Sequence, residues 1–429
     1  MMGGGGMRGG GFDGVDEGTL GGVVAVRGGA GGVLDFYRGD GRALYVGGCW
    51  GCGGLSGGSM RRCGARAGIV GMICGNRAGV ARNVVRLLKI VSDMSIRLIQ
   101  LRRGAERRLG FVEEPRVRLF EGFRSVYALT QAALESGRGV ADVMEDDLGD
   151  ELLDYEGIYN GKSEWKILPA IDHPEPARCV ISGTGLTHLG SAQNRSAMHE
   201  KIAGREEDLT DSMKMFRWGV EQGKPVDGKI GIAPEWFYKG NGSLLRGHGD
   251  GLEVPPYAED GGEEAEIVGV YVIDGAGNPV RVGMCQGNEF SDHVFERKNY
   301  LNLAGSKMRT SSIGPELVIH PAFVSVAGEA AVLREGKVLW SKPLVTGEQE
   351  MCHSLANMEH HHFKFGVHRR PGDVHVHFFG TSALSYGDGV RLRDGDVMQV
   401  HFEGFGRALR NPVRVAEGAD AMVAVRALP

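Results

Sequence analysis

Two glutamates, Glu264 and Glu266, stand at the start of an apolar run and could together bind a metal ion. Alternate side chains of a strand lie on one face, so Glu264 and Glu266 point the same way and Glu263 points to the opposite face. The run that follows, IVGVYVI, is apolar on both faces, which predicts a buried strand. Parallel carboxylates repel each other, and a cation that prefers oxygen ligands, such as Mg²⁺, relieves the repulsion. The alternative is a solvated strand edge with Glu264 facing water, because Glu-x-Glu pairs are common on strands.

Asp292 is the third carboxylate that we expect to complete this site. The apolar strand is predicted over residues 266–274, and a turn rich in glycine and polar residues follows over residues 274–278. A second strand then returns, so the residues that follow it come close to the start of the first strand. The spacing therefore predicts a magnesium ion on Glu264, Glu266 and Asp292.

The elements around this hairpin are typical of an α+β fold that is mostly β. Residues 95–114 predict a hairpin, and residues 121–146 predict a helix with a break at Gly137. Many short strands without βαβ alternation then favour an antiparallel or mixed roll over a doubly wound sheet. The predicted strands lie at residues 178–182, 266–274, 317–319, 323–326, 330–334, 374–379 and 396–402. We predict a small N-terminal α+β domain over residues 94–165 and a catalytic domain over residues 166–429.

The first 93 residues differ in composition from the rest of the chain. They hold 29 of the 71 glycines and four of the seven cysteines, but none of the 14 histidines. They carry 11 basic and six acidic residues, a net charge of +5, whereas residues 94–429 carry a net charge of −10. Glycine at this density makes ordering of the backbone costly, and the apolar residues form no sustained repeat. We expect translated upstream sequence before a true start at Met94, with a targeting peptide or a disordered extension as the alternatives.

Charge, hydropathy and cysteine content argue against several classes of protein. The net charge of −5 gives no electrostatic basis for binding nucleic acid or an anionic membrane. No stretch of 18 apolar residues exists, so no membrane span is predicted. Cys49 and Cys52 lack the second ligand pair that a zinc site needs. The three remaining cysteines fit a reducing compartment without disulfides, so we expect a cytoplasmic protein.

Four segments, in order, resemble the metal-site core of the fumarylacetoacetate hydrolase superfamily. They are EEAEIVGVYVI, NEFSDH, KMRTSSIGPEL and the region from PGDVHVHFFGTSALSYGDG to RNPV. In that superfamily a Glu-x-Glu pair, a following Asp and a Lys before Gly-Pro build the site. The resemblance implies a β-rich mixed roll, a small N-terminal domain and a homodimer. It also implies Mg²⁺ or Mn²⁺ on Glu264, Glu266 and Asp292.

The same resemblance assigns roles to residues outside the metal site. Lys307 would be the active-site lysine, a cation that holds the substrate carboxylate or shuttles a proton. Gly380 and Thr381 would form the Gly-Thr loop beside that carboxylate. The alternatives are a lysine on a solvated loop and an ordinary turn residue after Gly380.

The chain departs from the hydrolytic members of the superfamily at one motif. Those members carry NYxxHxxE, whose His–Glu pair activates a water molecule for attack on a carbonyl carbon. The matching segment here is GTGLTHLGSAQNRSAMHE, in which His188 stands at the tyrosine position. His199 and Glu200 are adjacent and cannot take the i, i+3 arrangement. A hydrolytic dyad is therefore not expected, and His188 is a candidate substrate-binding residue.

Glu235 points instead to the sugar-acid branch of the superfamily. The segment APEWFYKGNGSLLRGHGDG resembles 2-keto-3-deoxy-pentonate dehydratases, in which a glutamate near this point serves in proton transfer. The implied reaction removes a C3 proton to give an enolate that the metal ion stabilises, and the C4 hydroxyl then leaves with the help of an acid. Glu235 is the candidate for either proton transfer, and a plain surface glutamate is the alternative.

The histidines carry less information than the carboxylates. His375 and His377 share one strand face just before the Gly-Thr loop, so His377 is a candidate for substrate contact, with a hydrogen-bonded interior position as the alternative. The run of three histidines at residues 360–362 cannot face one ion together.

The sequence thus predicts a lyase that removes water from a 2-keto-3-deoxy sugar acid, which is a small 2-oxo acid. One example is a pentonate, whose dehydration gives 2,5-dioxopentanoate. An acylpyruvate-type C–C hydrolase, a related isomerase or decarboxylase, and a non-catalytic sugar-acid-binding protein are the alternatives.

Overall fold

The structure of the protein is a computed structural model that describes residues 25–28, 34–37, 43–45, 95–188, 209–226 and 228–428. The chain divides into two compact units, Met1–Arg77 and Ala78–Pro429. The first unit contains a three-stranded antiparallel sheet that the sequence analysis does not predict. Its strands are β1 (Ala25–Gly28), β2 (Leu34–Tyr37) and β3 (Ala43–Tyr45). Met94, the Cys49/Cys52 pair and the His199-Glu200 pair lie outside the described residues.

The second unit begins with the predicted hairpin and the predicted interrupted helix. The hairpin consists of β4 (Ile96–Arg103) and β5 (Glu106–Glu113), which pair antiparallel. The helical region forms α2 (Val126–Ser136) and α3 (Val140–Asp147). Gly137 separates the two helices because its φ of 63° lies in the left-handed region that glycine adopts at helix ends.

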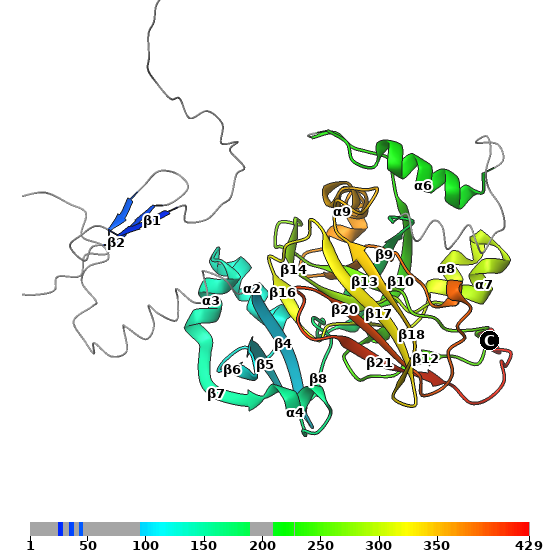
Figure 1. Ribbon diagram of the computed structural model, residues 1–429, viewed down its shortest axis with the longest axis horizontal. Helices are drawn as coiled ribbons and strands as arrows, with labels where there is room; N and C mark the ends of the chain where they lie inside the picture. The colour runs from blue at the N-terminus through cyan, green and yellow to red at the C-terminus, as the bar shows by residue number, and fades with distance from the viewer. Residues whose placement is uncertain are drawn as a thin grey trace, which may run out of the picture. The chain divides into compact units, whose positions relative to one another are not determined.

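A 13-stranded mixed sheet runs through the whole second unit (Figure 1). Its main path has the order β10-β9-β19-β13-β14-β16-β4-β5-β6-β7. The strands not yet given are β6 (Arg116–Phe120), β7 (Leu148–Asp154), β8 (Lys166–Ile167), β9 (Cys179–Gly185), β10 (Glu235–Asn241), β11 (Leu245–Arg246), β13 (Ala265–Ile273), β14 (Pro279–Asn288), β15 (Ser311–Ile313), β16 (Leu317–Ile319) and β19 (Val374–Phe378). Since β16 pairs with β4, the N-terminal strands continue the sheet that carries the candidate site. The domain boundary at residue 165 stays a prediction.

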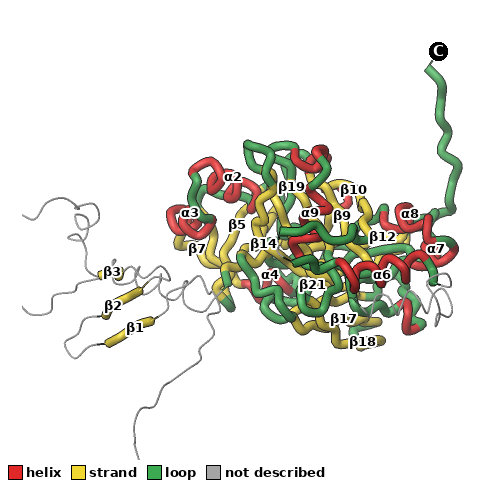
Figure 2. Tube along the Cα trace, turned by 90° about the horizontal axis from the view of Figure 1, so that it is seen from above, coloured by secondary structure: helices red, strands yellow, loops and turns green. Residues whose placement is uncertain are grey.

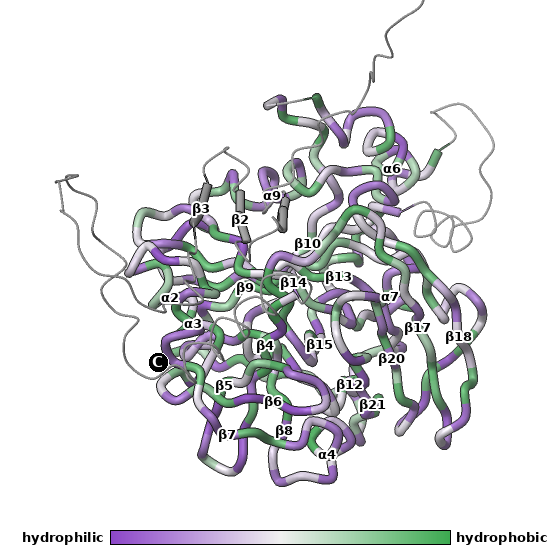
Figure 3. Tube along the Cα trace, turned by 60° about the vertical axis from the view of Figure 1, so that its left-hand side comes forward, coloured by the Kyte–Doolittle hydropathy of each residue, from purple (hydrophilic) through white to green (hydrophobic). Residues whose placement is uncertain are grey.

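A second, five-stranded sheet packs against one face of the large sheet. Its strands, in spatial order, are β12 (Leu252–Val254), β21 (Leu409–Val415), β20 (Val397–Phe402), β17 (Val326–Arg334) and β18 (Lys337–Thr346). Buried apolar side chains of β13, β14 and β16 meet those of β17, β20 and β21 in one core. A second core fills the space between the large sheet and helices α2 and α3. Figure 3 shows the apolar residues of the strands in green. This sandwich of mixed sheets confirms the predicted α+β, mostly β fold.

The remaining helices are 5 to 12 residues long, and Figure 2 shows α7 and α8 at one side of the unit. They are α4 (Tyr155–Tyr159), α6 (Asp211–Gln222), α7 (His293–Lys298), α8 (Leu303–Lys307) and α9 (Leu355–Phe363). Helices α7 and α8 follow β14 directly and lie beside each other at one end of the sandwich (Figure 1). None of the helices that the structure describes has the length and apolar character of a membrane span.

One predicted strand, over residues 323–326, is wrong. Residues 321–325 form an irregular segment, and β17 begins at Val326. Phe323 is buried and Val324 is exposed, so the alternation that the sequence shows comes from a loop packed on the core. The carbonyls of Phe323 and Val324 accept hydrogen bonds from residues 348 and 349 rather than from a strand ladder.

Glu316 connects the N-terminal strands to the rest of the unit. Its side chain is buried and accepts hydrogen bonds from the Tyr155 hydroxyl at 2.6 Å and from Arg97 at 2.9 Å. The backbone N–H of Arg407 also donates to it, at 3.1 Å. Burial raises the pKa of Glu316, while the charge of Arg97 acts in the opposite direction. The carboxyl group is thus held by donors from three separate parts of the chain.

We predict that Tyr155→Phe lowers the free energy of unfolding by about 1–3 kcal/mol, because a buried carboxyl group then lacks one donor. Urea unfolding followed by circular dichroism measures the change. Tyr257→Phe is the matched control, since Tyr257 is 61% exposed, and we expect it to change stability by less than about 0.5 kcal/mol. Equal effects of the two substitutions would contradict a role for the Tyr155 hydroxyl.

Candidate metal centre

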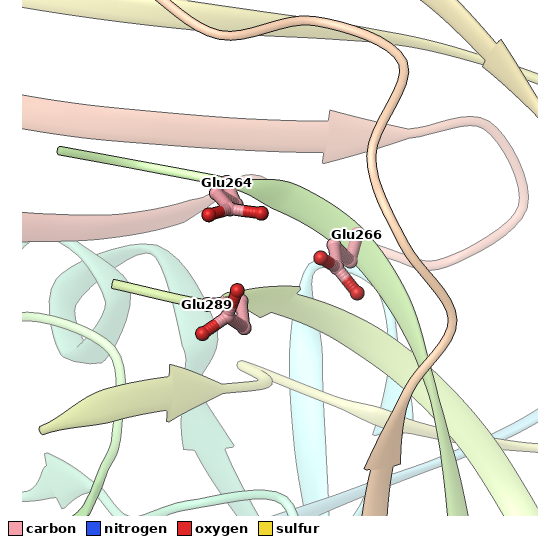
Figure 4. A group of neighbouring side chains, drawn as sticks. All are labelled: Glu264, Glu266 and Glu289. Atoms are coloured by element: carbon pink, nitrogen blue, oxygen red, sulfur yellow. The ribbon is translucent and has the colours of Figure 1, made fainter. Parts of the chain in front are cut away.

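Three buried glutamates meet at the open end of the β13–β14 hairpin (Figure 4). The register pairs Glu266 with Gly287, and the backbone N–H of Glu289 donates to the carbonyl of Glu264 at 2.9 Å. Residues opposite each other in an antiparallel pair share a face, so Glu289 lies on the face of Glu264 and Glu266. One carboxylate oxygen from each of the three lies within 4.8 Å of the others.

The electrostatics of this group fit a divalent cation. Burial first, and then the charges of Glu289 and Glu264, raise the pKa of Glu266 well above its ordinary value. Burial and the charge of Glu264 likewise raise the pKa of Glu289. Three carboxylates in one dry site disfavour their own ionisation, and a hard cation with oxygen ligands removes that penalty. Glu264, Glu266 and Glu289 are therefore the residues that would hold Mg²⁺ or Mn²⁺.

The prediction that Asp292 joins Glu264 and Glu266 is not met by the structure. Asp292 is the N-cap of α7, and its Oδ1 accepts from the backbone N–H of Phe295 at 2.9 Å. Its Oδ2 accepts from Arg309 at 2.7 Å and from the N–H of Glu259 at 2.9 Å. Both oxygens thus cap a helix and bind a buried guanidinium, and Glu289 takes the third position.

Two buried lysines neutralise part of the charge of the three glutamates. The predicted residue Lys307 lies at the end of α8, and its Nζ donates at 2.5 Å to Glu264 and at 2.5 Å to Glu289. Lys239 on β10 was not predicted; its Nζ donates to the other oxygen of Glu289 and to the carbonyl of Phe290 at 2.9 Å. Burial lowers the pKa of Lys239, and the charge of Glu289 opposes that shift. Both oxygens of Glu289 are therefore oriented by ammonium groups.

The inner face of β10 brings the predicted residue Glu235 toward the same region. Glu235, Phe237 and Lys239 alternate along the strand, and all three are buried. The Lys307 ammonium lies 4.8 Å from the centre of the Phe237 ring, a cation–π contact. Glu235 lies two residues beyond this ring and accepts a hydrogen bond from the Tyr300 hydroxyl.

The Gly-Thr loop reaches the glutamates through its backbone. The N–H of Gly380 donates to Glu266 at 2.6 Å. Gly380 has a φ of 93°, and a Cβ there would lie 2.0 Å from the hydroxyl of Thr187, so glycine is required. Thr381 turns its hydroxyl to its own loop, with a hydrogen bond to the carbonyl of Ala383 at 3.0 Å. Its predicted contact with a substrate stays a prediction.

The two histidines proposed for substrate binding have protein partners. Both ring nitrogens of His377 lie near hydroxyls, Ser182 at 2.8 Å and Thr184 at 2.7 Å. His188 is likewise held between Thr187 at 2.8 Å and Thr346 at 2.9 Å. Burial lowers the pKa of His188 to about 4 and that of His377 to about 3, so both rings are neutral near pH 7. This geometry matches the hydrogen-bonded interior alternative, and their substrate contacts stay predictions.

Sequence reasoning missed Glu289, Lys239 and Tyr300 as members of the site. Glu289 had a usable signal, because it directly follows a strand that must pair with the strand of Glu264. Lys239 had a weaker one, since it alternates with Glu235 in the segment EWFYK. Tyr300 had none, because its contact with Glu235 joins a short helical turn to a strand 65 residues away.

Solved structures of a sugar-acid dehydratase share this architecture. A hexagonal crystal form of 2-keto-3-deoxyarabinonate dehydratase matches with a TM-score of 0.56 at 17% identity, covering 75% of this chain and 100% of that chain. The same enzyme complexed with magnesium and 2,5-dioxopentanoate matches with a TM-score of 0.55 at 18% identity and the same coverage. The chain has the fold of this dehydratase. No family model and no curated protein matches the sequence.

The dehydratase fold agrees with the fold expected from the resemblance to the fumarylacetoacetate hydrolase superfamily. Two substitutions test whether Glu289 or Asp292 is the third ligand of the ion. We predict that Glu289→Gln weakens Mg²⁺ binding at least roughly tenfold, because one of three anionic ligands loses its charge. Isothermal titration calorimetry with MgCl₂ measures the affinity.

Asp292→Asn is the matched control for this prediction, since it also replaces a buried carboxylate by an amide. We expect it to change Mg²⁺ affinity by less than about threefold and to act on stability through its helix cap and Arg309. The opposite order of the two effects would restore Asp292 as the ligand.

Lys239 gives a further prediction within the dehydratase fold. Lys239→Met leaves Glu289 with one ammonium fewer, and loss of one partner of a buried pair costs about 3–5 kcal/mol. We expect that loss in urea unfolding without metal, and a smaller loss with Mg²⁺, because the cation then compensates the carboxylate. Lys337→Met, at an exposed position of β18, is the control. Equal stability of the two variants would refute this role of Lys239.

Proposed function

We propose that this protein is a metal-dependent hydro-lyase of the fumarylacetoacetate hydrolase superfamily that removes water from a 2-keto-3-deoxy sugar acid. The buried group of Glu264, Glu266 and Glu289, with Lys307 bonded to two of its members, is the observation that carries the proposal. A pentonate giving 2,5-dioxopentanoate is the substrate class that we favour. A homodimer is proposed with it from the family resemblance, and a cytoplasmic protein that binds neither nucleic acid nor membrane from the cysteine content and the net charge of −5.

The site offers separate groups for binding and for proton transfer. Glu264, Glu266 and Glu289 would hold a magnesium ion, whose positive charge would draw electrons from the 2-oxo group of the substrate. Lys307 provides a buried ammonium at the same edge, which suits a substrate carboxylate. The N–H of Gly380 keeps Glu266 turned toward the other two glutamates. These residues bind and orient an α-oxo acid.

Glu235 is the group that we propose for proton transfer. It lies on the same strand face as Phe237, whose ring contacts the Lys307 ammonium. Its carboxyl group would act on the C3–C4 part of a substrate whose carboxylate and 2-oxo oxygen would be held at the metal centre. Loss of water needs one proton removed at C3 and one delivered to the C4 oxygen.

The described part of the site fits a hydrolase less well than a hydro-lyase. A hydrolytic reaction needs a base that activates water, and the segment that matches the hydrolase motif, around His188, carries no His-x-x-Glu pair. His188, which stands in the corresponding segment, is buried and held between two threonines. Burial lowers its pKa to about 4, and its hydrogen-bond partners among the described residues include no carboxylate.

The test is turnover of the full chain with Mg²⁺ on a panel of 2-keto-3-deoxy acids, with detection of the semialdehyde product. We expect turnover of at least one C5 acid, and we expect Glu266→Gln to lower kcat at least roughly a hundredfold while the circular dichroism spectrum is unchanged. Metal-dependent loss of an acylpyruvate at comparable kcat/KM would favour the hydrolase instead. Binding without any turnover would favour a sugar-acid-binding protein.

A further inference from the structure

Tyr300 holds the proposed proton-transfer residue, although no motif of the sequence singles it out. It opens a short turn, Tyr300–Asn302, between α7 and α8. Its hydroxyl donates to Oε2 of Glu235 and lies 3.6 Å from the sulfur of Met215 on α6. Glu235 is 4% exposed, so this contact is made in a nearly dry environment, where a hydrogen bond to a carboxylate is strong.

The position of this pair relative to the glutamates follows from β10. Strand residues rise about 3.3 Å each, so Glu235 lies roughly 7 Å along the strand from Phe237. Lys239 binds Glu289, and Phe237 lies under Lys307. The Tyr300–Glu235 pair therefore follows Phe237 on this face, on the side away from Lys239.

A cavity of about 380 Å³ borders the same tyrosine. Its lining combines the residues around Tyr300 with the first turn of α6, and it is mostly polar: Leu209, Thr210, Asp211, Ser212, Lys298, Asn299 and Tyr300. The volume is in the range of small-molecule sites. One side of the tyrosine thus faces space for a small polar ligand, while its hydroxyl holds Glu235.

We propose that Tyr300 is a positioning residue that keeps the Glu235 carboxyl group directed at the C3–C4 bond of the substrate, so that the pair recognises the C4 hydroxyl. This role rests on the proposed dehydration. It adds Tyr300 and recognition of the C4 hydroxyl, neither of which the proposed function specifies. The glutamate takes the C3 proton and passes it to the C4 oxygen. The C3–H and C4–O bonds break, a C3=C4 double bond forms, water leaves, and Glu235 returns to its starting state. Tyr300 keeps its own proton throughout.

The test compares two ligands that differ only at C4: 4-hydroxy-2-oxopentanoate and 2-oxopentanoate, each titrated by calorimetry with Mg²⁺ present. We expect the wild-type protein to bind the hydroxylated acid about tenfold more tightly, as a hydrogen bond to a charged group predicts. Tyr300→Phe removes only the hydroxyl, so this preference should fall to about twofold or less, with the affinity for 2-oxopentanoate unchanged.

Two further variants complete the experiment. Tyr238→Phe makes the same change on β10 at a position that is 41% exposed, and it should keep the preference. Glu235→Gln retains an acceptor for Tyr300 but cannot transfer a proton; it should keep most of the preference and lose turnover of a 2-keto-3-deoxy acid.

The outcomes separate this inference from the proposed function. If Tyr300→Phe lowers the affinity for both acids equally, Tyr300 has only a structural role. If the preference for the hydroxylated acid is unchanged, Tyr300 lies outside the substrate site. If the wild-type protein binds both acids equally, the inference fails while the proposed dehydration is still decided by the turnover assay. If neither acid binds with Mg²⁺ present, the inference and the proposed function both fail.

Discussion

Three carboxylates held together away from water form the constraint on which the rest of the molecule depends. Their mutual repulsion and their loss of hydration both favour protonation, and burial raises the pKa values of Glu266 and Glu289 accordingly. The protein compensates with two lysines that have no exposed surface, each from a different element. Lys239, Lys307 and His293, whose Nε2 lies 3.1 Å from Oε1 of Glu264, all contact this group of carboxylates. A divalent cation would add the positive charge that keeps all three carboxylates ionised.

The fold supplies the rigid framework that such a charged site requires. The two sheets pack face to face, so the hairpin that carries the glutamates has apolar layers on both sides. Lys239 and Lys307 reach the glutamates from β10 and α8, and these elements contact each other directly. The two lysines thus come from a strand and a helix, whereas Glu264 and Glu289 lie one residue outside β13 and β14. The loops also contribute backbone donors such as Gly380. If one of these elements shifted, a buried charge would lose its partner, which costs free energy. This cost favours a single arrangement of the charged groups.

The sequence predicted the elements that carry a periodic signal and missed those fixed by distant contacts. The hairpin β4–β5, the helix break at Gly137 and the buried strand of Glu266 follow from alternation and turn chemistry, and all three are confirmed. The loop at residues 323–326 imitated a strand because one side chain packs on the core and the next is exposed. Lys307 followed from the family resemblance. Tyr300 has no local signal, since only the three-dimensional path of the chain brings it to Glu235.

The face on which Glu289 lies has a geometric origin within the hairpin. Pairing counted from the turn at residues 274–278 matches Ile273 with Pro279, and this register would place Asn288 opposite Glu264. The ladder instead shifts between Val270 and Tyr271, where one extra residue on β14 forms a bulge. Because the side-chain period of a strand is two, a shift of one residue exchanges the two faces of β14. Glu289 then faces Glu264. A one-residue irregularity, which alternation and turn type do not reveal, thus places this carboxylate beside the other two.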